Sequence, residues 1–486
     1  MTDIGRRTFV RSTVVAGVGT SIMPSIISAE STDSKEINLL PFIIAPKKII
    51  IAGAGIAGLC CGYELMKRGH EVTVLEASGR HGGHVLTGYD GLSDGLYADF
   101  GAEHITKPGY DRYWQYIDEF NLPVMAYPRR DNILRRIDGQ FYTEEMLADP
   151  IILKKFGLNQ REIKYLSQNP WWDLESLYVK PYLDDFTDEY QPFGAGFDHL
   201  DVQSMSELFQ KDGASAGALK LLGGQHVSTL YELWRTAILH LRGVPLFPTK
   251  VFRLRGGNQG LTNTFAKRLG ERVKLNCPIT SISHGETGVT VTYTEFGESE
   301  EISADFMVNC IPLPIFQRIQ LHPVLSPEKQ FVVHNVTYGS YSRLVFQARS
   351  KFWLDDNLSI NMQLNHPLIN SVWQVAEEVD THRVALMGVA PGGVEPWDAA
   401  KAFKDIYPGK HFTIEQAMIK DWTKERFAPM CERLDFPIGQ LKKFWPHVME
   451  PHGRIHFAGS YADNLNWGME AATRSANRVA EAIHQA

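Results

Sequence analysis

A glycine-rich turn between two short apolar strands is the feature that most constrains the fold of this chain. Residues 49–52 form a β-branched run that is typical of a buried parallel strand. Three glycines follow at G-x-G-x-x-G spacing: Gly53, Gly55 and Gly58. A helix is then predicted from residue 56 to residue 68, and a second strand from residue 71 to residue 75. This order predicts a βαβ unit in a parallel sheet covered by helices.

The βαβ context makes the three glycines a predicted dinucleotide site. Gly53 allows a tight turn, Gly55 lets the backbone approach a pyrophosphate, and Gly58 lets the helix pack close to the strand. The first helical residues, Ile56 and Ala57, present unpaired N–H groups and the positive end of the helix dipole to the phosphates. A glycine-rich turn without a ligand is the alternative interpretation.

Glu76 ends the second strand, where a carboxylate can bind both hydroxyls of a ribose. The following residues include Arg80, the pair Gly82-Gly83, His84 and Thr87. This run resembles the E-A-x-x-R-x-G-G-R-x-x-T pattern of FAD-dependent amine oxidases, which implies FAD as the cofactor. The resemblance assigns four further residues to cofactor binding: Ala77, Arg80, Gly83 and His84. Because His84 replaces the second arginine of the pattern, one pyrophosphate contact is expected to be weaker or neutral.

Length and charge exclude several classes of protein. A chain of 486 residues with 44% hydrophobic and 22% charged residues fits two globular domains. The net charge is -7; the first 29 residues carry one Asp and three Arg, so the remainder is more acidic still. An acidic protein lacks the basic surface that binds nucleic acid. Five cysteines without metal-ligand spacing predict neither a metal site nor a disulfide framework.

The N-terminus resembles an export signal. Residues 5–10 read GRRTFV, which is similar to a twin-arginine motif, and a mildly apolar run follows from Ser12 to Ile27. That run is too short and too interrupted by Gly and Pro to span a membrane stably. We therefore expect residues 1–29 to direct export to the periplasm, a route that carries proteins already folded around a cofactor. A disordered N-terminal tail is the alternative.

Residues near the expected flavin extend the resemblance. The stretch from Leu96 to Ile105 is similar to the D-x-G-A strand of the family, which assigns Gly101, Ala102 and Glu103 to cofactor binding. His104 falls where monoamine oxidases have a residue that lines the substrate cavity. A hydrogen-bonded structural role for His104 is the alternative.

Later segments supply the remaining cofactor contacts that the resemblance implies. Ile279 aligns with the aliphatic residue that covers the adenine edge, and two more strands are predicted after it, over residues 289–294 and 302–310. Gly459 and Ser460 match the R-I-x-F-A-G-E strand, with serine in place of the acid that contacts the ribityl chain. Trp467 is the displaced aromatic of the G-Y-M-E-G-A pattern. Met469 begins a predicted helix whose N-terminus would face the flavin pyrimidine.

The block that begins at Trp422, itself assigned to the cofactor, carries two further predictions. Monoamine oxidases have a flavin-bound cysteine nine residues after this tryptophan, and a cage tyrosine follows it. Those positions are Cys431 and Glu432 here. We expect FAD to be bound without a covalent bond and keep a link through Cys431 as the alternative.

Arg343 lies in register with the lysine that holds a water against flavin N5 in that family. It falls in one of four predicted antiparallel strands, residues 342–348, 359–364, 371–377 and 383–389. Arginine keeps the positive charge, but it cannot release a proton. Its planar fork also suits a carboxylate. Arg343, Glu432, His104 and Trp467 are therefore the candidate catalytic residues.

The resemblance to flavin monoamine oxidases, polyamine oxidases and L-amino acid oxidases implies an α/β fold. A Rossmann-type FAD domain of the glutathione-reductase-like kind is expected from residues 46–106, 246–314 and 422–486. A substrate domain with an antiparallel sheet and helices is expected from residues 107–245 and 315–421. The implied activity is hydride transfer from the C–H bond next to nitrogen, in a small-molecule amine or amino acid, to FAD. Dioxygen or another acceptor would reoxidise the flavin, and a homodimer is left open.

Two other functions are compatible with the same cofactor motifs. One is an FAD-dependent desaturase or dehydrogenase that acts on a substrate without nitrogen. The other is a flavin-binding protein without turnover. Reduction of the flavin by a substrate would exclude the second, and activity only on nitrogen-free compounds would favour the first.

Overall fold

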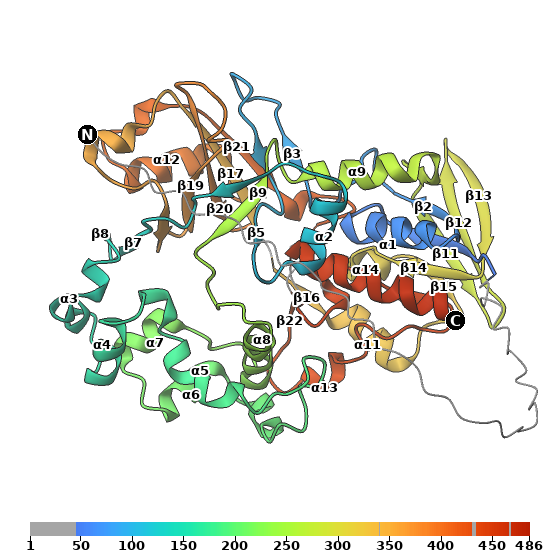
Figure 1. Cartoon of the computed structure of the whole chain (residues 1–486), viewed down its shortest axis with the longest axis horizontal. Helices are drawn as coiled ribbons and strands as arrows, with labels where there is room; N and C mark the ends of the chain where they lie inside the picture. The colour runs from blue at the N-terminus through green and yellow to red at the C-terminus, as the bar shows by residue number, and fades with distance from the viewer. Residues whose placement is uncertain (1–44, 340, 430–433, 466–467) are drawn as a thin grey trace, which may run out of the picture. The chain divides into compact units, whose positions relative to one another are not determined.

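A parallel sheet built from distant parts of the sequence is the framework of the cofactor site (Figure 1). The computed structural model describes residues 45–339, 341–429, 434–465 and 468–486. Five strands run parallel in the order β10-β2-β1-β14-β23. Their bounds are Val273–Lys274, Glu71–Leu75, Lys48–Ala52, Phe306–Asn309 and Ile455–Phe457. The predicted first two strands are therefore present, side by side, at the centre of this sheet.

Three helices that pack together accompany the sheet. Helix α1 (Ile56–Lys67) packs against α14 (Gly468–Gln485) and α9 (Gln259–Leu269), and Figure 1 shows α1 and α14 side by side. A small residue also lets α1 pack closely on the sheet: a Cβ on Gly62 would lie 3.2 Å from Cδ1 of Ile51 in β1. The buried contacts between helices and strands make a continuous apolar core.

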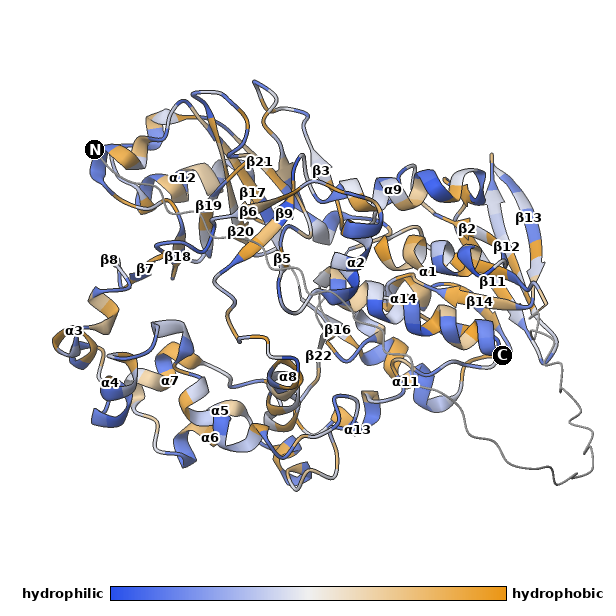
Figure 2. Cartoon of the chain, viewed as in Figure 1, coloured by the Kyte–Doolittle hydropathy of each residue, from blue (hydrophilic) through white to orange (hydrophobic). Residues whose placement is uncertain are grey.

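A second sheet of four strands has the order β13-β12-β11-β15, with bounds Glu298–Ala304, Val289–Glu295, Ile279–His284 and Gln320–His322. The strand predicted from residue 302 to residue 310 is in fact two strands in two sheets. Strand β13 lies mostly exposed at an edge, whereas all four residues of β14 are buried in the parallel sheet. Figure 2 shows this contrast, because β14 is hydrophobic and β13 largely hydrophilic.

A third sheet of seven strands has the order β21-β17-β20-β19-β18-β7-β8. The bounds are Ile414–Asp421, Ser342–Ala348, Val384–Ala390, Ser371–Val375, Met362–Leu364, Leu134–Ile137 and Gln140–Tyr142. Helix α12 (Pro396–Ile406) packs on it through Phe403, which contacts Phe346. The strand predicted to begin at residue 359 begins at Met362, since the Ser359 hydroxyl accepts the N–H of Asn361 and makes a local turn.

The remaining sheets are small. Strands β5 (Ile105–Thr106), β9 (Val251–Leu254) and β6 (Val124–Tyr127) form one, and β3 (Thr87–Gly88) pairs with β4 (Ala98–Asp99). Strand β16 (Thr337–Tyr338) pairs with β22 (Leu434–Asp435). The continuous strand expected over residues 96–105 is therefore two short strands, β4 and β5, with an irregular segment between them.

Helices dominate residues 107–245. They are α2 (Asp111–Glu119), α3 (Pro150–Lys155), α4 (Gln160–Leu166), α5 (Ser176–Leu183), α6 (Met205–Lys211), α7 (Ala216–Leu222) and α8 (Thr229–Leu241). Capping boxes start two of them, through Asn159 and Ser204. Three short helices lie elsewhere: α10 (Leu313–Phe316), α11 (Pro327–Asn335) and α13 (Leu441–Phe444). Among the described residues, no helix is long and apolar enough to cross a bilayer. The predicted assignment of segments to two domains stays a prediction.

Candidate active site

The turn between β1 and α1 has the geometry that its glycines predict. Gly53 has a φ of +99°, and a Cβ at this position would lie 3.3 Å from the carbonyl oxygen of Cys310. A Cβ on Gly58 would lie 1.9 Å from the Gly53 carbonyl oxygen, so only glycine fits there. A Cβ on Gly55 would meet no atom within 4 Å. The open space at Gly55 is where the backbone can approach a ligand.

Glu76 is held in place at the end of β2 by three hydrogen bonds. Its Oε2 accepts the N–H of Ala54 at 2.7 Å. Its Oε1 accepts the N–H of Ser78 at 2.9 Å and the Ser78 hydroxyl at 2.8 Å. Because each carboxylate oxygen can accept more than one hydrogen bond, Glu76 can still accept from a pair of ribose hydroxyls.

A cavity of about 660 Å³ extends from Glu76 past the glycine turn to the start of α14. Fourteen of the predicted cofactor residues line it: Gly53, Gly55, Ile56, Ala57, Glu76, Ala77, Arg80, Gly83, His84, Ala102, Ile279, Gly459, Ser460 and Met469. They come from five separate parts of the sequence. The structure therefore brings these residues together around one elongated space.

The other four predicted cofactor residues lie just outside the cavity lining. Gly58 packs beneath the turn, and a Cβ on Gly101 would lie 1.7 Å from the His84 carbonyl oxygen. Trp422 is fully buried; its Nε1 donates to the Phe100 carbonyl oxygen at 2.8 Å, and its ring lies 4.1 Å from that of His84. These three residues support the wall of the cavity. Glu103 is buried and is described with the arginines below.

Several lining residues were not predicted from the sequence. They are Ser78, Cys277, Pro278, Thr280, Thr294, Cys310, Ile311, Pro312, Tyr338, Tyr461 and residues 425–428, among others. The segment 425–428 is tied to the predicted site because Nε2 of His84 lies 2.9 Å from the Ala428 carbonyl oxygen. Its sequence, Glu-Arg-Phe-Ala, carries no cofactor motif, so only the tertiary structure identifies it.

The cavity fits FAD. One end offers the Glu76 carboxylate to a ribose, and the middle offers the open face at Gly55 and the N-terminus of α1 to a pyrophosphate. The far end includes Gly468 and Met469, the first residues of α14, whose dipole favours negative charge. The apolar side chains between these points suit the flat rings of a dinucleotide. The residues present can therefore hold FAD over its whole length.

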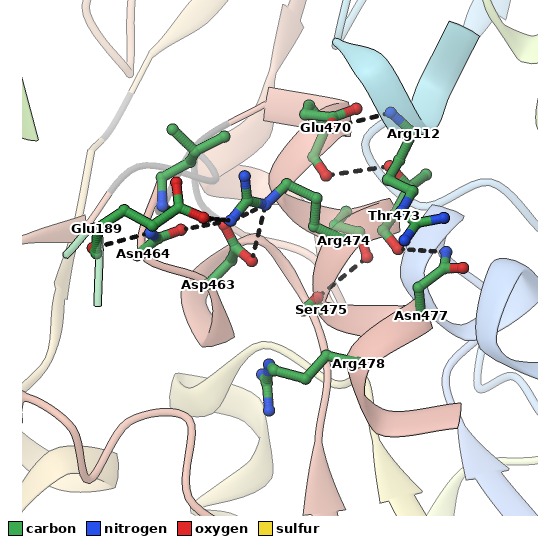
Figure 3. A network of polar contacts seen from close by, with 12 residues as sticks. Arg112, Glu189, Asp463, Asn464, Glu470, Thr473, Arg474, Ser475, Asn477 and Arg478 are labelled. Carbon is green, nitrogen blue, oxygen red and sulfur yellow. Dashed lines mark hydrogen bonds and ion pairs between the residues drawn. The ribbon is translucent and has the colours of Figure 1, made fainter. Parts of the chain in front are cut away.

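A polar network holds the segment before α14 in place (Figure 3). Nη2 of Arg474 donates to Asn464 at 2.9 Å and to Glu189 at 3.2 Å, and Nε lies 3.2 Å from an Asp463 oxygen. The side chain of Asn464 also donates to the Glu189 carbonyl oxygen at 2.9 Å. Since Gly459 and Ser460 lie just before this segment, the network fixes a wall of the cavity from behind.

Arg343 lies beside the flavin end of the cavity. Its Nη2 donates to the carbonyl oxygen of Gly101 at 3.1 Å, next to the lining residue Ala102. Its guanidinium carbon is 5.0 Å from the Tyr341 ring centre and 5.8 Å from that of Trp373. The side chain is thus a partly buried cation that packs against two aromatic rings.

His104 lies between two arginines. Its Nδ1 is 3.3 Å from Oε1 of Glu103 and 3.2 Å from Nη1 of Arg129, and its Nε2 is 3.3 Å from Nη2 of Arg130. Arginine nitrogens can only donate, so Nε2 accepts from Arg130. Nδ1 lies between the Arg129 donor and the Glu103 carboxylate, an acceptor. His104 therefore links the two arginines to Glu103.

Glu103 is paired with a cation. Arg129 forms an ion pair with its carboxylate, and the Arg129 guanidinium carbon lies 3.9 Å from the Trp373 ring centre. Among the described residues, no group of three or more His, Cys, Asp or Glu could hold a metal ion. Two predicted catalytic residues, Glu432 and Trp467, lie outside the described residues, as do Cys431 and the predicted signal at residues 1–29.

Comparison with known proteins gives the family. The sequence profile described as flavin containing amine oxidoreductase matches residues 56–484. An L-amino-acid oxidase of Vipera ammodytes ammodytes is 26% identical over 475 residues, which covers 91% of this chain and 93% of that protein. An L-amino-acid oxidase of Bothrops atrox is 25% identical over 477 residues, with coverage of 91% and 89%.

Solved structures share the fold. Cyclohexylamine oxidase from Brevibacterium oxydans superposes with a TM-score of 0.75 at 20% identity, over 91% of this chain and 99% of that one. Wild-type putrescine oxidase bound to putrescine gives a TM-score of 0.75 at 19% identity, over 91% and 100%. The predicted fold class, the FAD cofactor and oxidation at the C–N bond of an amine or amino acid are confirmed. This chain belongs to the family of flavin-containing amine oxidoreductases, and it is an FAD-dependent enzyme of the amine oxidase type.

Proposed function

We propose that Arg343 is the cation that acts beside the flavin when this enzyme oxidises its amine or amino acid. One observation supports this role above all: Arg343 donates to the Gly101 carbonyl oxygen next to the cavity wall at Ala102. The Nε of Arg343 is buried and has no hydrogen-bond partner among the described residues. A partly buried guanidinium with an unused donor near the cavity is available to a ligand or a water.

The chemistry divides between cofactor and chain. FAD, held by the glycine turn and Glu76, would supply the acceptor for a hydride from the C–H bond next to the substrate nitrogen. Arg343 stays charged throughout, so it favours negative charge at the flavin end and orients a water or a substrate carboxylate. The buried walls around Trp422 and Gly101 exclude bulk water, which strengthens this effect. Arg343 cannot deliver a proton, so proton transfer must involve another group or water.

Replacing Arg343 by methionine tests the proposal. Arg343→Met roughly keeps the length and removes the charge with all five donors. Loss of one preorganised donor typically slows a reaction by about 10²- to 10³-fold. We expect stopped-flow traces to show slower flavin reduction or slower reoxidation, with FAD still bound. Arg349→Met, just beyond the same strand and exposed, is the control. If Arg343→Met has wild-type rates in both half-reactions, Arg343 does not act beside the flavin.

The substrate class follows from a screen of flavin reduction without oxygen. The relatives named L-amino-acid oxidase favour amino acids, whereas the solved neighbours are named for cyclohexylamine and putrescine. We propose that amines and amino acids bleach the flavin and that alicyclic compounds without nitrogen do not. Bleaching only by nitrogen-free compounds would replace this proposal with desaturation. No bleaching by any member would show that the substrate of this enzyme lies outside the compounds screened.

We further propose that the enzyme works in the periplasm. Arg6 and Arg7 within the twin-arginine-like motif support this location. Changing both to lysine should leave the protein in the cytoplasm with FAD bound, as judged by fractionation and the flavin spectrum. Normal amounts outside the inner membrane would contradict a twin-arginine route. Oxygen uptake during turnover would identify dioxygen as the electron acceptor, and light scattering would test for a homodimer.

A further inference from the structure

A small cavity of about 60 Å³ adjoins the flavin end of the large one. A Cβ on Gly468, which lines the large cavity, would lie 2.6 Å from the Tyr110 hydroxyl, which lines the small one. At about 15 Å³ for each water centre, the small cavity has room for about four waters. Its polar lining residues are His104, Thr106, Tyr110, Arg130, Arg242 and Glu470. The size suits a small polar group of a substrate that reaches the flavin.

Arg130 is a cation in the lining of this cavity, and the described residues give it no carboxylate partner. Its guanidinium carbon is 4.3 Å from the Phe247 ring centre, and Nη1 donates to the Pro248 carbonyl oxygen at 2.5 Å. Nη2 donates to His104. Among the described residues, no carboxylate lies within ion-pair distance of Arg130. Burial lowers the pKa of Arg130 to about 10, so the guanidinium is still charged at neutral pH.

The other charges near the cavity are already paired. Arg242 donates to both oxygens of Glu189, at 2.7 Å and 3.1 Å. Arg129 is paired with Glu103. Glu470 accepts two backbone N–H groups at the start of α2, and burial raises its pKa to about 7. The cavity therefore keeps an excess of positive charge, which comes from Arg130. A carboxylate ligand would supply a counter-ion to this partly buried cation.

We propose that this cavity binds a carboxylate of the substrate through Arg130, so that the enzyme selects amines that carry a carboxylate. The inference rests on the proposed oxidation at the flavin and deepens it by naming the substrate class. The planar fork of Arg130 suits a carboxylate, and the stacked Phe247 ring fixes the plane of the fork. Arg343 is then left to act at the flavin. Arg130 is a specificity-determining residue in this scheme.

Two matched pairs of ligands test the proposal on the FAD-loaded protein. L-Phenylalanine and 2-phenylethylamine differ only in the carboxylate, and anaerobic bleaching of the flavin gives a Kd for each. Benzoate and benzamide cannot be oxidised, and a flavin difference spectrum reports their binding. We expect the carboxylate member of each pair to bind more tightly. Equal or weaker binding of both carboxylates would overturn the proposal while amine oxidation stands. Lack of bleaching by either amine would instead contradict the proposed function.

Variants of Arg130 test whether this residue causes the preference for carboxylate ligands. Arg130→Gln removes a charged hydrogen-bond donor, so the preference for benzoate over benzamide should fall by on the order of 10- to 100-fold. Arg130→Lys keeps the charge and should retain part of the preference. Arg135→Gln is the matched control, because Arg135 also stacks on an aromatic ring, at 4.2 Å from Trp171, but lies outside the cavity. An unchanged preference in a folded, FAD-loaded Arg130→Gln protein would assign the carboxylate to another residue.

Discussion

Glu76 shows how much of the cofactor site depends on a single residue. Its carboxylate is already oriented by Ala54 and Ser78, so binding a ribose requires little further ordering. Glu76→Ala should weaken FAD binding by about 1.5–3 kcal/mol, which is roughly a 10- to 150-fold rise in Kd. Fluorescence titration of the apoprotein measures this change. Glu71→Ala, exposed at the other end of β2, is the control. Equal affinity in Glu76→Ala and wild type would place the ribose contact elsewhere.

Glu470 makes stability depend on pH. Burial raises its pKa from 4.5 to about 7, although two backbone N–H groups and Arg242 act in the opposite direction. Between these values the folded protein keeps the proton while the unfolded chain loses it. The stabilisation from Glu470 is therefore complete below the unfolded pKa and is lost as the pH rises through 7. The loss amounts to about 3 kcal/mol at most, at about 1.4 kcal/mol per pKa unit.

Glu470→Gln should flatten this pH dependence. The variant cannot ionise, so its Tm should fall less than that of the wild type between about pH 5 and about pH 8. Differential scanning calorimetry at several pH values measures the difference. Glu481→Gln, exposed on the same helix α14, should keep the wild-type profile. Parallel curves for Glu470→Gln and wild type would show that another group causes the pH dependence.

At the scale of one element, two glycines in the turn between β1 and α1 have different roles: one is needed for folding and the other for cofactor binding. Gly58→Ala would force a Cβ to within 1.9 Å of a backbone oxygen, so it should destabilise the βα unit by several kcal/mol or prevent folding. Gly55→Ala meets no protein atom within 4 Å and has a φ of -68°, which alanine tolerates. We expect Gly55→Ala to fold normally but to bind FAD less tightly, because its methyl group occupies the open face of the turn.

Circular dichroism and FAD titration of the two variants separate these effects. A Gly55→Ala protein with wild-type stability and wild-type FAD affinity would show that no ligand approaches this glycine. A stable Gly58→Ala protein would show that the turn can relax away from the contact. Either result would revise the role that the sequence assigns to that glycine.

At the scale of the whole molecule, one cavity is lined by segments that lie far apart in the chain, from residue 53 to residue 472. A ligand that touches all of them stabilises the folded state as a unit. FAD at about 100 times its Kd should add about 2.7 kcal/mol to the free energy of unfolding. A rise in Tm with added FAD, measured on apoprotein freed of flavin by dialysis, checks this. Flavin that stays with the chain after acid precipitation would contradict non-covalent binding and favour the link through Cys431.

Local sequence determined the elements of the cofactor site. The β-branched run, the three glycines and Glu76 fix β1, the turn, α1 and β2, because backbone freedom and apolar periodicity act over a few residues. The same local signals failed where burial decides the outcome. Residues 302–310 read as one strand, but β13 and β14 belong to different sheets because only β14 is buried on both faces.

Tertiary structure alone decided which charged residues near the substrate are paired. Arg129 and Arg130 are neighbours in the sequence, yet one is paired with Glu103 and the other faces a cavity without a carboxylate partner among the described residues. Pairing depends on distances between residues that lie 20 or more positions apart, and sequence spacing does not contain them. The sequence by itself therefore determined that this protein binds a dinucleotide in a βαβ unit. The packing of distant segments decided which arginine can meet a substrate.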